Sequence, residues 1–172
     1  MAVALIAAAA CDSDSSTPSV NMPPVVNPPQ ASFDITVLNA TNAQPLSPIA
    51  IIAHEAGYSV FSVGAAATGG FEEMAEGGDN TALIAEADAD AAVILTASGA
   101  APIGPAGSET IRIMLDEADR SGLHISVATM LVNTNDAFTA LNGWPVDGMA
   151  VGDVMTVNAV AYDAGTEFDS ET

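Results

Sequence analysis

The sequence predicts a mainly β protein, an antiparallel β-sandwich with one or two short helices in its connections. Three observations support this fold class. Short runs of alternating apolar and polar residues recur along the chain, clusters of Asn, Asp, Gly and Pro separate them, and no strand–helix–strand repeat of the Rossmann type is present. Such a spacing of short strands and turns is typical of sandwiches.

Composition limits the possible partners. The 172 residues include 22 Asp and Glu but only 2 Lys and Arg, which gives a formal net charge of −20. We do not expect nucleic-acid binding, because neutralising phosphates requires clustered Lys and Arg and the chain has only Arg112 and Arg120. The same charge opposes docking on anionic lipids and favours cations, including metal ions. An acidic surface that only holds water and counterions is the alternative.

The first eleven residues indicate export. The stretch 1–10 is apolar but too short to span a bilayer as a helix, and it has the length of a signal-peptide hydrophobic region. Small residues directly before Cys11 resemble a bacterial lipoprotein processing site, at which the cysteine receives a lipid. We therefore expect a cell-envelope protein that is lipid-anchored at Cys11 or secreted. An ordinary secretory signal with an incidental cysteine is the alternative.

Residues 12–32 are expected to form a tether. Serine, aspartate and paired prolines dominate this stretch, and they favour an extended, solvated chain. The folded domain is expected to cover residues 33–172. It contains no cysteine, so no disulfide stabilises it.

Hydrophobic periodicity places the elements of this domain. Strands are expected at 33–38, 49–53, 92–96, 109–116, 123–131 and 154–160, with 58–63 as either an edge strand or an extended loop. The runs 109–116 and 123–131, joined by a short polar link, predict an antiparallel hairpin.

Helical signals are fewer. A short helix is expected at 71–76 between two glycine pairs, and a second follows Asp79 or Asn80, either of which can act as its cap. Residues 137–141 are expected to form one helical turn. Trp144, in the loop that follows, is expected to fill the core rather than to be an exposed recognition residue.

Sequence motifs for catalysis are missing. The chain has no GxGxxG, P-loop, HExxH, GxSxG or CxxC pattern, so we assign no catalytic or cofactor-binding residue. His124 is expected on the surface or rim of a strand. His54, at a strand end beside Glu55, has the better claim to a chemical role, and a calcium- or carboxylate-dependent hydrolase near His54 is the enzymatic alternative.

Two segments concentrate oxygen ligands. The first is Asn133-Thr-Asn-Asp136, and the second is Tyr162-Asp163-Ala-Gly-Thr-Glu167. Calcium prefers six to eight hard oxygens supplied by flexible loops, and Gly165 permits tight curvature between Asp163 and Glu167. The spacing therefore makes Asp136, Asp163 and Glu167 candidate calcium ligands. A solvated acidic loop is the alternative.

The same residues resemble a known family. The run Met130-Leu-Val-Asn-Thr-Asn-Asp136-Ala-Phe, together with the Asp-Ala-Gly-Thr-acid run that begins at Asp163, is similar to the spondin domain of F-spondin-type matrix proteins and of bacterial lipoproteins. The stretches 35–48 and 61–64 also resemble its bacterial members, and the resemblance covers about residues 33–169.

This resemblance implies a sandwich similar to C2-type domains, the C2- or immunoglobulin-like form of the predicted fold. It also implies a calcium ion held by acids that match Asp136, Asp163 and Glu167; animal members carry aspartate at the last position. Bacterial members continue into a further strand, so we expect either truncation at the C-terminus or an open sheet edge.

From the family and the residues together, the sequence predicts a non-catalytic, calcium-binding domain of the cell envelope that functions in adhesion or ligand recognition. Its expected partners are calcium and an extracellular protein or glycan, with membrane contact only through the lipid. A passive assembly subunit that uses an open sheet edge is a further alternative.

Overall fold

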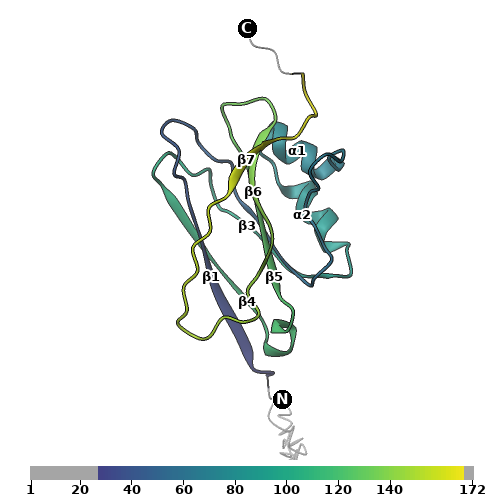
Figure 1. Ribbon diagram of the computed structural model, residues 1–172, viewed down its shortest axis with the longest axis vertical. Helices are drawn as coiled ribbons and strands as arrows, with labels where there is room; N and C mark the ends of the chain where they lie inside the picture. The colour runs from purple at the N-terminus through teal and green to yellow at the C-terminus, as the bar shows by residue number, and fades with distance from the viewer. Residues whose placement is uncertain (1–26, 169–172) are drawn as a thin grey trace, which may run out of the picture.

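The computed structural model describes residues 27–168, which form a mainly β domain (Figure 1). Seven strands lie in two antiparallel sheets, and two short α-helices lie between β2 and β3, so the predicted fold class is confirmed. The elements are β1 (Gln30–Leu38), β2 (Ala50–His54), α1 (Gly69–Gly77), α2 (Thr81–Asp88), β3 (Val93–Ser98), β4 (Ser108–Asp116), the 3-10 helix η1 (Glu117–Arg120), β5 (His124–Met130), β6 (Ala137–Pro145) and β7 (Val160–Asp163). No helix in this part of the chain has the length and apolar character needed to cross a membrane.

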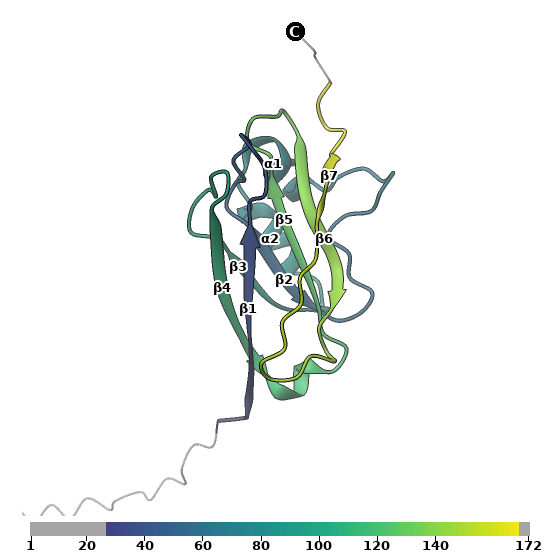
Figure 2. The same cartoon turned by 60° about the vertical axis from the view of Figure 1, so that its left-hand side comes forward.

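The sheets and helices form layers. The larger sheet has the order β3-β2-β5-β6-β7, and the smaller one pairs β1 with β4. Helices α1 and α2 cover one face of the larger sheet, while β1 and β4 pack on the other (Figures 1 and 2). Strand β2 is buried on both faces as a result.

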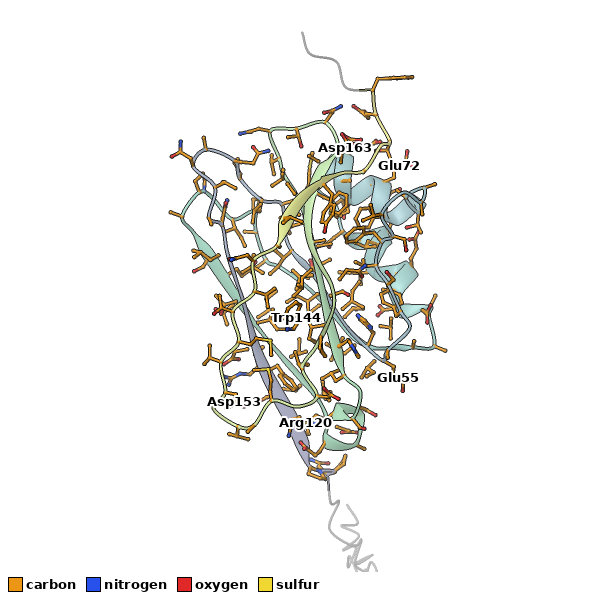
Figure 3. The ribbon with its side chains drawn as sticks, viewed as in Figure 1. Glu55, Glu72, Arg120, Trp144, Asp153 and Asp163 are labelled. Atoms are coloured by element: carbon orange, nitrogen blue, oxygen red, sulfur yellow. The ribbon has the colours of Figure 1, made fainter. Side chains whose placement is uncertain are left out.

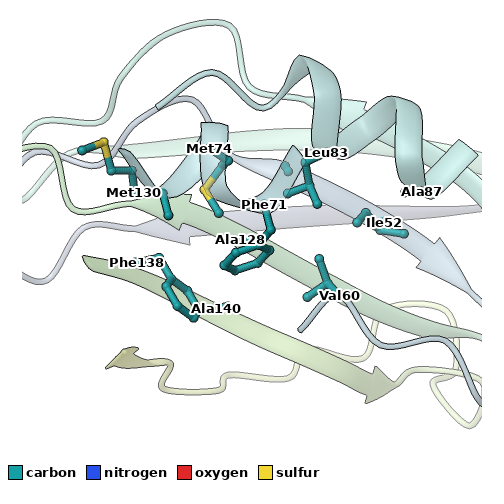
Figure 4. Packing of buried hydrophobic residues seen from close by; sticks show 12 residues of the cluster. Ile52, Val60, Phe71, Met74, Leu83, Ala87, Ala128, Met130, Phe138 and Ala140 are labelled. Atoms are coloured by element: carbon teal, nitrogen blue, oxygen red, sulfur yellow. The ribbon is translucent and has the colours of Figure 1, made fainter. Parts of the chain in front are cut away.

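Two apolar clusters separate these layers. On the helical side, Ile52 of β2 and Phe138 of β6 pack against Phe71, Met74 and other residues of the helices (Figure 4). On the other side, residues that alternate with them, such as Ile51, pack against the inner face of β4. The period of two within β2 therefore serves both cores.

Helix α1 begins and ends as its glycine pairs predict. The Thr68 hydroxyl accepts a hydrogen bond from the Phe71 N–H at the N-terminus, and Gly78 ends the helix in the left-handed conformation with φ 73°. The Glu86 carboxylate from α2 accepts hydrogen bonds from the Gly70 N–H, at 2.7 Å, and the Thr68 hydroxyl.

The predicted hairpin of residues 109–116 and 123–131 is wrong. Strand β4 pairs with β1, in a register that places Ile113 opposite Phe33, whereas β5 pairs with β2 and β6. Helix η1 carries the chain from one sheet to the other. The apolar alternation predicted in both runs is present, because Ile113 of β4 and Ile125 of β5 lie in the same core cluster. The two strands belong to different sheets and face each other across that core.

The helical turn predicted at 137–141 is also wrong, because these residues begin β6. Phe138 and Ala140 are buried and Thr139 between them is only partly buried. Burial at every second residue is the pattern of a strand, whereas a helix would bury every third or fourth residue. Gly143, at φ 67°, lies within this strand near an irregularity in its pairing with β5. Trp144 follows on β6 and is 37% exposed, so its predicted role as a core residue is wrong.

The last strand lies later in the chain than predicted. Residues 154–159 belong to no strand, and β7 covers only 160–163. Strand β1 starts three residues before the expected boundary, at Gln30, because Gln30 pairs with Asp116. Residues 58–63 form an extended loop. The signal segment, Cys11 and residues 12–26 of the tether lie outside the described residues.

Candidate metal centre

Pairing between β6 and β7 brings the two predicted acidic segments to the same end of the sheet. Asp136 directly precedes β6, Asp163 is the last residue of β7, and Asp163 is the register partner of Ala137. Figure 3 shows Asp163 at one end of the molecule. Residues 133–136 and 163–167 are hereafter called the acidic tip.

The Asp136 side chain is the most enclosed acid of the tip, with 1% of its surface exposed. Its Oδ2 atom accepts hydrogen bonds from the Thr166 N–H at 3.0 Å, the Glu167 N–H at 3.1 Å and the Thr166 hydroxyl at 3.3 Å. The Asp136 carbonyl also accepts the Ala164 N–H, at 3.3 Å. This one residue therefore fixes the loop that follows β7.

The buried charge of Asp136 has no cationic side chain beside it. The two ion pairs among the described residues are Arg112–Asp34 and Arg120–Glu117, and neither involves the tip. Burying a carboxylate is costly unless donors or a cation compensate it. The amide and hydroxyl dipoles of Thr166 and Glu167 supply part of that compensation.

Asp163 and Glu167 are exposed at the tip. The Asp163 Oδ1 atom accepts the Gly165 N–H at 2.7 Å in a tight turn, and Gly165 has φ 69°, which a residue with a side chain rarely adopts. Within residues 27–168, however, no three His, Cys, Asp or Glu side chains converge as a ready metal cage. The two loops contact each other through Asp136, and the Asp163 carboxylate accepts its hydrogen bond from Gly165 in its own loop.

The donor set nevertheless fits a hard cation. The three carboxylates belong to two loops that contact each other, and calcium binds carboxylate, carbonyl and water oxygens in flexible geometry. Asp136 would supply its oxygen that is free of the Thr166 and Glu167 hydrogen bonds, and the exposed Asp163 and Glu167 would turn toward it. The ion would supply charge compensation and crosslink the two loops.

Thr166 is the tip residue that the sequence did not single out. Its N–H and its hydroxyl both donate to Asp136. The signal was present, because this threonine is part of the Asp-Ala-Gly-Thr-acid run, but only the acids of that run carried an expected role.

A cavity of about 220 Å³ adjoins the tip. It lies between the loop 59–68 and the ends of β6 and β7, and Asp163 is among its lining residues. Its aromatic wall comes from Phe61, Phe71, Phe138 and Tyr162, which pack mutually with ring centroids 4.7 to 5.9 Å apart.

His54 lies away from the acidic tip, at the far end of β2. It is buried, its Nδ1 is 2.8 Å from the Glu55 carbonyl oxygen, and its Nε2 is 2.9 Å from the Ser126 hydroxyl. Burial lowers the pKa of His54 below its usual value. Ser126 is fully enclosed, and neither partner of the imidazole is a carboxylate. His124 pairs with His54 in register and is half-buried.

No protein-family model and no curated protein matches the sequence. The resemblance to the spondin domain therefore remains a prediction.

Proposed function

We propose that the protein is a non-catalytic, calcium-binding domain of the bacterial cell envelope, which functions in adhesion or ligand recognition. Calcium has a structural role in this proposal: it neutralises Asp136, Asp163 and Glu167 and holds the loops before β6 and after β7 together. The observation that carries the proposal is the buried Asp136 carboxylate, which contacts the second acidic loop and has no cationic side chain beside it among the described residues.

Electrostatics support this reading. A divalent ion that joins three carboxylates removes their mutual repulsion and offsets the cost of burying Asp136. The whole chain, at −20, draws cations toward its surface. Both side chains are exposed, so turning Glu167 into the site costs side-chain rotamer freedom. For Asp163 the same turn also costs the hydrogen bond from the Gly165 N–H, unless the second carboxylate oxygen binds the ion.

Thermal unfolding of the full chain tests the calcium site. At ten times the dissociation constant, calcium would add about 1.4 kcal/mol of stability. For a domain of this size that raises the melting temperature by about 5 °C relative to chelator-treated protein. Asp163→Asn is expected to remove most of this increase.

Asp90→Asn is the matched control, because Asp90 Oδ1 accepts an N–H two residues ahead, from Ala92, as Asp163 does from Gly165. Asp90 lies in the turn between α2 and β3, away from the acidic tip. A melting temperature that does not respond to calcium or to chelator would contradict the proposal.

The envelope location has its own test. Lipid attachment at Cys11 would hold the domain on a membrane through the tether, so wild-type protein is expected in the membrane fraction and Cys11→Ser in the soluble fraction. Soluble wild-type protein with an intact Cys11 would leave secretion as the route and refute the lipid.

A further inference from the structure

The segment between β6 and β7 contains an exposed, unpaired strip, defined here as residues 154–160. The backbone of residues 154–159 makes no hydrogen bond to any other described residue. Figures 1 and 2 show these residues running along the side of the molecule and leading directly into β7. β7 is itself the edge strand of the five-stranded sheet.

The strip is apolar as well as unpaired. Val154 is 89% exposed, Val160 57% and Met155 46%, and the Sδ of Met155 accepts a hydrogen bond from the indole N–H of Trp144. Residues 154–162 include three valines, one threonine and one tyrosine, and none of these nine positions is charged. An extended, β-prone edge of this kind is a template for pairing with another strand.

Acids stand at both ends of the strip. Asp153 precedes it, and Asp163 and Glu167 follow it; Figure 3 shows Asp153 and Asp163 far apart along the segment. The two cations among the described residues are both engaged, Arg112 with Asp34 and Arg120 with Glu117. A partner strand with a basic residue at each end would therefore complement the edge.

A second copy of this chain is the less favourable occupant. Antiparallel pairing of two copies about Val157 would place Asp153 of one copy opposite Ala161 of the other. Asp153 would then be diagonal to the other copy's Asp163, and this contact would occur twice. Diagonal neighbours across a strand pair are close enough to interact, and like charges there destabilise the pairing.

We propose that the strip and β7 form a docking edge for an extended peptide segment of a partner protein, with alternating apolar side chains and a Lys or Arg at each end. The partner's backbone pairs with the free edge, its apolar side chains cover Val154 and Val160, and its basic ends meet Asp153 and Asp163. Calcium bound at Asp163 would compete with the partner's basic end there, so docking is expected to be strongest without calcium.

Hydrogen exchange on the full chain in chelator tests the proposal. The probe is the synthetic peptide KVTVTVTVTVK, whose two lysines are ten residues apart, as Asp153 and Asp163 are. The controls are EVTVTVTVTVE and the proline-interrupted KVTVTPTVTVK. The lysine peptide is expected to protect the amides of residues 154–159 and to bind about tenfold more tightly than the glutamate peptide, because both end charges are reversed. The proline peptide is expected not to protect them, since proline removes a backbone donor.

Two substitutions locate the edge. Thr156→Pro is expected to abolish protection while the melting temperature stays unchanged, because residue 156 makes no backbone hydrogen bond within the described fold. Asp153→Asn is expected to weaken the lysine peptide about two- to fivefold at low salt. Asp90→Asn is the control and should leave binding unchanged. Asp90, like Asp153, accepts a backbone N–H in a turn.

Three results would overturn the proposal: no protection by any peptide, equal binding of the lysine and glutamate peptides, or protection of the strip that rises with protein concentration alone. The last result would identify a second copy as the occupant. Because calcium is absent from the assay, failure of the docking edge and failure of the calcium site are distinguishable.

Discussion

Two carboxylates in this molecule connect segments that are distant in the sequence, and they do so in opposite surroundings. Glu86 lies exposed at the N-terminus of α1, where it accepts hydrogen bonds from the Gly70 N–H and the Thr68 hydroxyl. Asp136 accepts the N–H groups of Thr166 and Glu167 while almost fully buried.

The difference lies in what compensates the charge. A helix N-terminus carries partial positive charge and is a natural place for a carboxylate. Asp136 has no helix behind the loop that it contacts, and Asp163 and Glu167 add negative charge nearby. Similar hydrogen bonds therefore act beside a helix N-terminus at Glu86, whereas under our proposal a cation completes the compensation at Asp136.

The largest expected effect comes from deleting each carboxylate. Asp136→Ala leaves two backbone N–H groups without their acceptor in a buried setting, and we expect a loss of about 3 kcal/mol in the free energy of unfolding. Glu86→Ala removes an exposed cap and should cost about 1 kcal/mol. Urea denaturation of both variants in chelator measures the difference, and equal losses would contradict the contrast.

Asp136→Asn separates charge from hydrogen bonding at the same position. The amide oxygen can still accept the Thr166 and Glu167 N–H groups, so stability in chelator should change little. The response to calcium should disappear. A variant that retains the wild-type response to calcium would exclude Asp136 as a ligand.

Helices α1 and α2 pack closely at Gly70, next to the hydrogen bonds of Glu86. A Cβ atom on Gly70 would lie 2.6 Å from the Leu83 nitrogen and 2.8 Å from the Glu86 Cδ, so Gly70→Ala should cost about 2 kcal/mol through overpacking. Gly77→Ala is the control in the same helix, because nothing lies within 4 Å of its Cβ position. Similar melting temperatures for the two variants would show that the helices can separate at little cost.

His54 provides a second buried polar site in addition to Asp136, and its contribution to stability is expected to depend on pH. Burial lowers the pKa of His54 in the folded state, so below about pH 6.5 the unfolded chain binds a proton that the folded chain binds less readily. Stability should therefore fall as pH falls from 6.5 toward the lowered pKa. Subtracting the pH profile of His54→Gln from that of wild type isolates this contribution.

The charge of His124, on the neighbouring strand, also contributes to the lowered pKa of His54, so His124→Gln should reduce the pH dependence of wild type. His54 also faces the Tyr58 ring, with centroids 4.9 Å apart, and stacks on His124 at 5.9 Å. A flat difference profile between pH 5 and 7 would refute the assignment of His54 as a buried neutral imidazole.

The smallest expected effect is at the surface pair between β1 and β4. Arg112 contacts Asp34 through two hydrogen bonds, of 2.6 and 2.7 Å, and lowers the pKa of Asp34. Both side chains are exposed, so Arg112→Gln should change stability only slightly at low salt and not at all in high salt. A loss that persists in high salt would point to a packing role for the arginine.

The sequence was most informative where apolar periodicity and glycine act locally. The strand at 33–38, the buried strand around Ile51 and the helix between the glycine pairs all followed from such patterns. The pairing of strands could not be predicted in the same way. Helix η1 carries the chain from one sheet to the other, and no local pattern in β4 or β5 shows whether two strands are hydrogen-bonded neighbours or lie in opposite sheets. Alanine and leucine favour a helix at residues 137–141, which is why the sequence predicts one there. The structure forms a strand instead, because Phe138 and Ala140 are buried against the helices, a tertiary contact that the local sequence does not reveal.

The candidate site was predicted at the level of its loops. Acid spacing and glycine placed Asp136, Asp163 and Glu167 together, and the β6–β7 pairing brings their segments to one end. The burial of Asp136 and the donors of Thr166 could not be inferred, because they arise from the way the loop after β7 folds back over the start of β6.

Calorimetric titration of calcium into the chelator-treated full chain tests the central claim most directly. We predict one saturable site per chain, with a dissociation constant on the order of 10⁻⁴ to 10⁻³ M as in extracellular modules. This heat should be lost in Asp136→Asn and in Asp163→Asn and kept in Asp90→Asn. An absence of saturable heat in wild type, or the same heat in all three variants, would contradict the claim.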